Sequence, residues 1–152
     1  MRGGLSAGVI AAAATGGVIA GFGVREGSAA EPFASLGRLL LGIATSEPAG
    51  RQLVALFAGI ALHSATALLW GLIFAALFAH LRGLRLGVAA ALFAAVAYAA
   101  STKLPGLLRL GYGARAFLPQ LVLLYTALAV SLVAGIRLAR TNGHIGDLAH
   151  RR

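Results

Sequence analysis

Residues 53–79 read LVALFAGIALHSATALLWGLIFAALFA, an apolar run of about 27 residues that contains no Asp, Glu, Lys or Arg. As a helix, this run would be roughly 40 Å long at 1.5 Å per residue. Crossing the hydrocarbon core of a bilayer takes only about 20 apolar residues. The run therefore predicts a membrane-spanning helix that tilts or extends beyond the hydrocarbon.

Three further apolar runs, residues 5–24, 84–102 and 117–136, are also long enough to cross a bilayer, and basic residues follow each of them. The first could instead be a signal peptide with small residues before its cleavage site, but its apolar run is too long for a typical signal core. We therefore predict an all-α membrane protein: a four-helix transmembrane domain over residues 1–140, followed by a polar basic tail over 141–152.

Composition supports this class. The chain is 59% hydrophobic and 11% charged, whereas soluble domains are about half apolar and roughly a quarter charged. The absence of cysteine excludes thiolate chemistry, iron–sulfur clusters and cysteine zinc sites. The 13 Lys and Arg residues are scattered between the apolar runs. We expect them to contact anionic lipid headgroups, and we expect no nucleic-acid partner.

The longest connection between runs, residues 25–52, contains the segment PFASLGRLLLGI. Its apolar residues recur at helical spacing, and Pro32 suits a first helical position. These apolar residues are Phe33, Leu36, Leu39, Leu40 and Ile43. The pattern predicts a short amphipathic helix at the membrane interface between the first two spans.

The distribution of basic residues predicts how the chain is oriented in the membrane. The short turn from Arg82 to Arg85 and the basic tail favour N- and C-termini in the cytoplasm. Residues 104–119, LPGLLRLGYGARAFLP, are apolar with interspersed arginines. We expect this segment to lie in the headgroup zone.

Small residues recur every four positions in all four runs, a spacing that favours close helix packing in lipid. The members of these stripes are Gly17 and Gly21 in the first run, Gly71 and Ala75 in the second, Gly87, Ala91, Ala95 and Ala99 in the third, and Ala127, Ser131 and Gly135 in the fourth. The unbroken stripe of the third run is the strongest of these signals. Together they predict a tightly packed bundle.

The second run carries polar residues on one helical face, because His63, Thr66 and Trp70 stand at positions i, i+3 and i+7. Exposure to lipid would cost His63 and Thr66 their hydrogen bonds, so we expect this face to meet protein. The candidate partners are Tyr98, Gln120, Tyr125 and Thr126. Three roles for His63 stay open: a neutral ring that bonds a neighbouring helix, a contact to haem or quinone, and a proton relay or substrate contact.

The sequence contains few residues that would form a haem, metal, transport or catalytic site. His63 and His80, the two histidines of the apolar region, lie about 25 Å apart along one helix, so this chain alone cannot clamp a haem between two histidines. His63 is the one candidate ligand for a haem, quinone or pigment shared with a partner, and no metal site is expected. The four carboxylates all lie outside the runs, which argues against coupled transport. No catalytic triad or phosphate-binding loop is present, so we expect no enzymatic activity.

Residues 62–87, LHSATALLWGLIFAALFAHLRGLRLG, resemble a segment of small four-span bacterial inner-membrane proteins of unknown function. The similar positions cover about one sixth of the chain. They are His63, Ser64, Trp70, Gly71, Leu72, Ile73, Phe74 and Ala75, with Arg82 and Arg85 in the basic turn. The resemblance implies a four-span fold in a bacterial inner membrane and no particular activity.

These observations favour a non-catalytic accessory subunit of a larger bacterial membrane complex, with respiratory and photosynthetic assemblies as the leading hosts. Its partners would be other membrane subunits. The alternative is a small homo-oligomeric channel or carrier with His63 lining the pathway.

Overall fold

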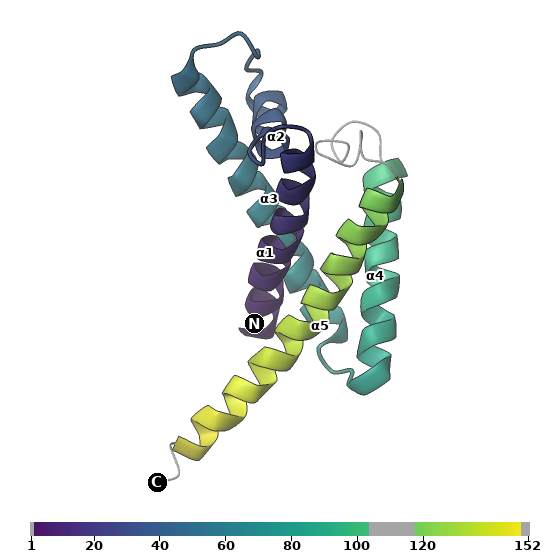
Figure 1. Ribbon diagram of the computed structural model, residues 1–152. Coiled ribbons are helices and arrows are strands. Elements are labelled where there is room, and N and C mark those ends of the chain that lie inside the picture. Colours follow the sequence, from purple (N-terminus) through teal and green to yellow (C-terminus); the bar gives the residue numbers. More distant parts are fainter. Residues whose placement is uncertain (1, 104–117, 150–152) are drawn as a thin grey trace.

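The computed structural model describes residues 2–103 and 118–149. Within these ranges the chain is helical and contains no strand (Figure 1). The helices are α1 (Arg2–Arg25), α2 (Glu31–Leu41), α3 (Ala49–Phe78), α4 (Gly83–Lys103) and α5 (Leu118–Ala149). All except α2 are long and apolar enough to cross a membrane. The predicted class, an all-helical multi-pass membrane protein, is confirmed.

The helices extend beyond the predicted runs. Helix α3 begins directly after Pro48, several residues before the predicted start of its span. Helix α5 continues to Ala149, so most of the predicted tail is helical and projects past the other helices (Figure 1). Most of the segment 104–119, which we expect in the headgroup zone, lies outside the described residues.

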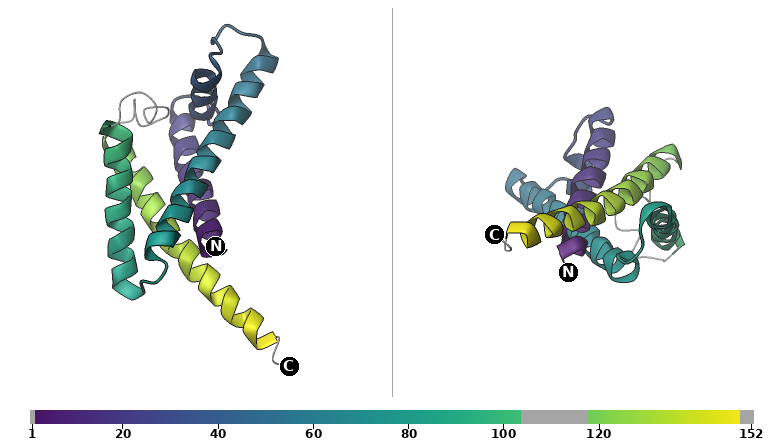
Figure 2. Two further views of the ribbon diagram at one scale, coloured as in Figure 1. Left: turned by 180° about the vertical axis from the view of Figure 1, so that it is seen from behind. Right: turned by 90° about the horizontal axis from the view of Figure 1, so that it is seen from below.

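The long helices alternate in direction and pack in the order α3, α1, α5, α4, so both termini point toward the same end of the molecule (Figures 1 and 2). Helices α3 and α4 share few contacts and meet near the turn that joins them. There Phe93 of α4 packs against Trp70, Phe74 and Phe78 of α3, with ring centroids 5.4–6.2 Å apart. We call this end, with the turn at residues 79–82, the turn end.

Helix α1 occupies the centre because small residues let its backbone touch both neighbours. A methyl group at Gly71 of α3 would overlap the backbone of Gly8, and one at Gly135 of α5 would overlap the backbone of Ala7. Such close approach gives helices dispersion contact that apolar side chains alone do not provide in lipid. The centre of the bundle is therefore built on glycine and alanine.

At the turn end, the side chain of Arg140 on α5 binds the turn between α3 and α4. The guanidinium of Arg140 donates hydrogen bonds to the carbonyls of Ala79 and Leu81, the latter at 2.7 Å. The last carbonyls of a helix have no partner within that helix, and a cation there also complements the helix dipole. Arg140 thus ties the α3–α4 turn to α5.

The predicted short helix between the first two spans is present as α2, and it packs on α3. Its small residues pack against the N-terminal half of α3, and a methyl group at Gly37 would overlap the backbone of Ala55. The leucines at positions 39–41 face outward, with exposed fractions of 46–61%. The helix ends at Gly42, whose φ of 65° suits glycine. Arg38 pairs with Glu31 and also donates to Gln52 of α3 at 3.2 Å.

Only part of the predicted small-residue stripes packs within the chain. Gly71, Ala75, Ser131 and Gly135 lie in or beside the centre, and Ala127 is partly buried. A methyl group added at Gly17, Gly21 or Gly87 would have no neighbour within 4 Å, and Ala91, Ala95 and Ala99 are exposed. The buried face of α4 instead carries Leu86, Ala90, Ala94 and Ala97. Because α4 is rich in alanine on every side, residue spacing alone could not select the face that packs.

Candidate functional site

The polar centre of the molecule is His63 on α3, at the junction of α1, α2 and α3. Its ring approaches α1 beside Gly16, where a methyl group would stand 3.4 Å from Nε2. Phe33 of α2 meets the ring edge to face, with centroids 5.6 Å apart. The side chain is therefore partly enclosed by three helices, which agrees with the prediction that it faces protein.

The hydrogen bonds of His63 define its tautomer. Nε2 lies 3.2 Å from the Thr15 hydroxyl and 3.3 Å from the Ala12 carbonyl. The Thr15 hydroxyl donates to the Ala11 carbonyl at 2.6 Å, so toward the ring it can only accept. A carbonyl also only accepts, so Nε2 carries a proton and shares it between both oxygens. In the neutral ring the lone pair then resides on Nδ1.

The other residues of the predicted polar face do not join His63. The expectation that Thr66 meets protein is wrong: Thr66 is exposed and donates to the Leu62 carbonyl of its own helix at 2.8 Å, which satisfies its hydroxyl without a neighbouring helix. Trp70 packs on Phe93. Tyr98 and Tyr125 face each other across α4 and α5, with ring centroids 5.4 Å apart. The expectation that His63 bonds the third or fourth span is therefore wrong, and its partners lie on α1.

Sequence reasoning missed Thr15, although a signal was present. Residues Ala7, Ala11 and Thr15 follow one another at four-residue spacing, and Gly8 lies next to this stripe. This is the face of α1 that is buried in the structure. The predicted stripe of α1 is instead Gly17 and Gly21, the more familiar glycine pair, which faces outward. In α1, the stripe that contains the polar Thr15 marks the packed face, and the glycine pair does not.

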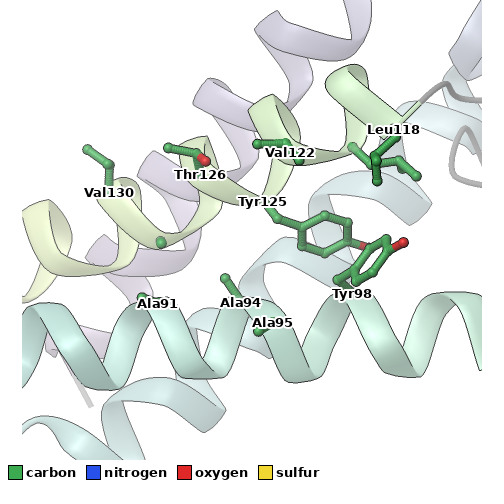
Figure 3. Close-up of a pocket in the computed structure, with 11 residues that line it drawn as sticks. Ala91, Ala94, Ala95, Tyr98, Leu118, Val122, Tyr125, Thr126 and Val130 are labelled. Atoms are coloured by element: carbon green, nitrogen blue, oxygen red, sulfur yellow. The ribbon is translucent and has the colours of Figure 1, made fainter.

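A second candidate site is a groove between α4 and α5 with a volume of about 340 Å³ (Figure 3). Alanine side chains form its floor, and the tyrosine pair with Thr126 supplies its polar atoms. The residues that line it are Ala91, Ala94, Ala95, Tyr98, Leu118, Leu121, Val122, Tyr125, Thr126, Ala129 and Val130. Two members of the predicted α4 stripe, Ala91 and Ala95, thus line an outward-facing groove instead of the bundle centre.

The described part of the chain offers no cluster of metal ligands. Groups of three or more His, Asp or Glu side chains close enough to hold a metal ion are absent among the residues searched. To ligate a shared haem through Nε2, His63 would have to break both of its contacts to α1. His63 therefore acts as a link between α3 and the helices α1 and α2.

The helix-linking role of His63 predicts a measurable loss of stability in His63→Leu. We expect the free energy of unfolding to fall by about 1 kcal/mol, the scale of hydrogen bonds between membrane helices. Thermal unfolding in mild detergent measures this. Thr66→Val is the matched control and should be nearly neutral, because Thr66 bonds only its own helix. Equal melting temperatures for His63→Leu and the unmodified protein would contradict the role.

In comparisons with known proteins, no family model, no curated protein and no solved structure matches this chain.

Proposed function

We propose that this chain is a non-catalytic accessory subunit of a larger membrane assembly, and that the α4–α5 groove receives a membrane-spanning helix of a partner subunit. A bacterial inner membrane with cytoplasmic termini, and a respiratory or photosynthetic host, are the settings that the sequence favours. The groove is the observation that carries the proposal.

The floor of the groove supports a helix as its occupant. Ala91 and Ala95 stand one helical turn apart and are exposed, and Ala129 faces them from α5. Small side chains at this spacing allow a third backbone to approach closely, which is how helices associate in lipid. Exposed Thr126 adds a hydroxyl group at the rim for a partner helix to contact, and the rings of Tyr98 and Tyr125 add apolar surface (Figure 3).

The stripe of Gly17 and Gly21 on α1 offers a second outward face. Neither glycine has a neighbour within 4 Å of a substituted methyl group, so alanine side chains fit there without disturbing the chain itself. A partner that packs on α1 would be displaced by such side chains. This face and the groove together give the chain more packing surface than its own four spans use.

Crosslinking from one engineered cysteine tests the proposal, and the natural chain contains no cysteine to interfere. Ala95→Cys, labelled with a benzophenone in native membranes, should yield a single adduct with a heterologous membrane protein. Leu69→Cys, on an exposed position of α3 outside the groove, is the control and should yield no such adduct. Purification in mild detergent should recover the same partner in a stoichiometric amount.

The alternative is a homo-oligomeric channel or carrier with His63 lining the pathway. Adducts from Ala95→Cys that contain only copies of this chain would overturn the accessory role and favour this alternative. The absence of any protein adduct from the groove would overturn both the partner helix and its site.

A further inference from the structure

A second hollow, of about 610 Å³, lies between α3 and α4 at the turn end and does not overlap the α4–α5 groove. Eight of its nine lining residues are apolar, and the ninth is Arg85 in the first turn of α4. The lining consists of Leu77, Phe78, Leu84, Arg85, Val88, Ala89, Leu92, Phe93 and Val96. It is an apolar hollow with a single cation near one end.

The dimensions of this hollow match one lipid leaflet. From Leu84 to Val96 it follows α4 for twelve residues, about 18 Å at 1.5 Å per residue. Half of the hydrocarbon core measures about 15 Å. Because α4 begins at Gly83, Arg85 stands where a membrane-spanning α4 enters the headgroup region, and Val96 stands near the bilayer centre.

The charges at this end favour an anion. Arg82 precedes α4, and Arg137 lies on α5 near the contact of Arg140 with the turn. Among the side chains that the structure describes, no carboxylate pairs with Arg85. The carboxylates that form ion pairs are Glu31 and Glu47, which lie beyond the other end of α4. A phosphate would therefore meet a guanidinium that has no competing acid among the described side chains.

We propose that the α3–α4 hollow binds an anionic phospholipid of the leaflet at the turn end, with one acyl chain along Val88, Leu92 and Val96 and the headgroup phosphate on Arg85. Guanidinium groups bind phosphate oxygens through paired hydrogen bonds. The apolar lining then holds the chain that the headgroup positions. This site is independent of the partner helix proposed above.

Trp70, the single tryptophan of the chain, is placed to report on the site. Its ring packs on Phe93, which lines the hollow, with centroids 5.5 Å apart. Bromine atoms on a lipid acyl chain quench tryptophan fluorescence at short range. In vesicles of phosphatidylcholine and phosphatidylglycerol, we expect brominated phosphatidylglycerol to quench Trp70 with about fivefold preference over brominated phosphatidylcholine, the effect of one arginine at the membrane surface.

Arg85→Gln should abolish the preference and leave the protein folded, because Arg85 is exposed and forms no described ion pair. Arg85→Lys should retain most of it. Arg25→Gln is the matched control: it removes an exposed arginine at the end of α1 away from the turn end and should leave the preference unchanged. Raising the salt concentration should weaken the preference through screening.

Three results would overturn the assignment. Equal quenching by both brominated lipids would show that no headgroup is selected. A preference that survives in Arg85→Gln would place the anion elsewhere. Quenching by neither lipid would show that the hollow is closed to acyl chains.

Discussion

Replacing Gly71 by alanine should strongly destabilise the protein, because one methyl group there separates α1 from α3. The new Cβ would stand 2.5 Å from Cα of Gly8 and 2.9 Å from the Gly4 carbonyl oxygen. These are backbone atoms, which cannot rotate away as a side-chain end can. Overpacking of this kind costs about 1–3 kcal/mol and sometimes more. Thermal unfolding in mild detergent should show a clear fall in Tm.

The matched control is the same substitution at Gly17 on the outer face of α1. No atom lies within 4 Å of the new methyl group, so no clash opposes it. Alanine is a better helix former than glycine by up to about 1 kcal/mol, so Gly17→Ala should be neutral or stabilising. A Gly71→Ala variant as stable as Gly17→Ala would contradict the α1–α3 contact.

Replacing Gly59 by alanine should release α2 from α3 and leave the centre of the bundle in place. The added methyl group would overlap the Phe33 carbonyl and stand 3.1 Å from the Gly37 nitrogen. Both atoms belong to the backbone of α2, so the whole short helix must move. Its leucines already face outward, and apart from its packing on α3 few contacts hold it. We expect hydrogen exchange over residues 31–41 to accelerate by about tenfold or more, since overpacking costs more than 1 kcal/mol.

Gly50→Ala on the same helix is the control for this prediction, because nothing lies within 4 Å of its added methyl group. Exchange in α2 should then match that of the unmodified protein. The Gly59→Ala variant should also weaken the Phe33–His63 ring contact while the Thr15 contact persists. Unchanged protection of α2 in Gly59→Ala would contradict the packing of α2 on α3.

Much of the helical organisation could be predicted from the sequence. The four spans and the short helix after Pro32 follow from apolar length, proline position and basic flanks, which are local properties. His63 could also be predicted to face protein, because an unpaired polar side chain is costly in lipid. The partner of His63 could not be predicted, since Thr15, Tyr98 and Tyr125 all offer hydroxyl groups of suitable chemistry and only the helix arrangement separates them.

The sequence by itself determined that four segments are long and apolar enough to cross a membrane, because the transfer of an apolar helix into lipid depends on each segment's own composition and length. Only the tertiary structure decided which helix faces meet. In lipid, no hydrophobic gradient distinguishes one apolar face from another, so packing is settled by how closely backbones can approach. That approach occurs at Gly8 with Gly71 and at Ala7 with Gly135. In the equally regular stripe from Gly87 to Ala99, the three alanines are exposed and a methyl group at Gly87 would have no neighbour within 4 Å.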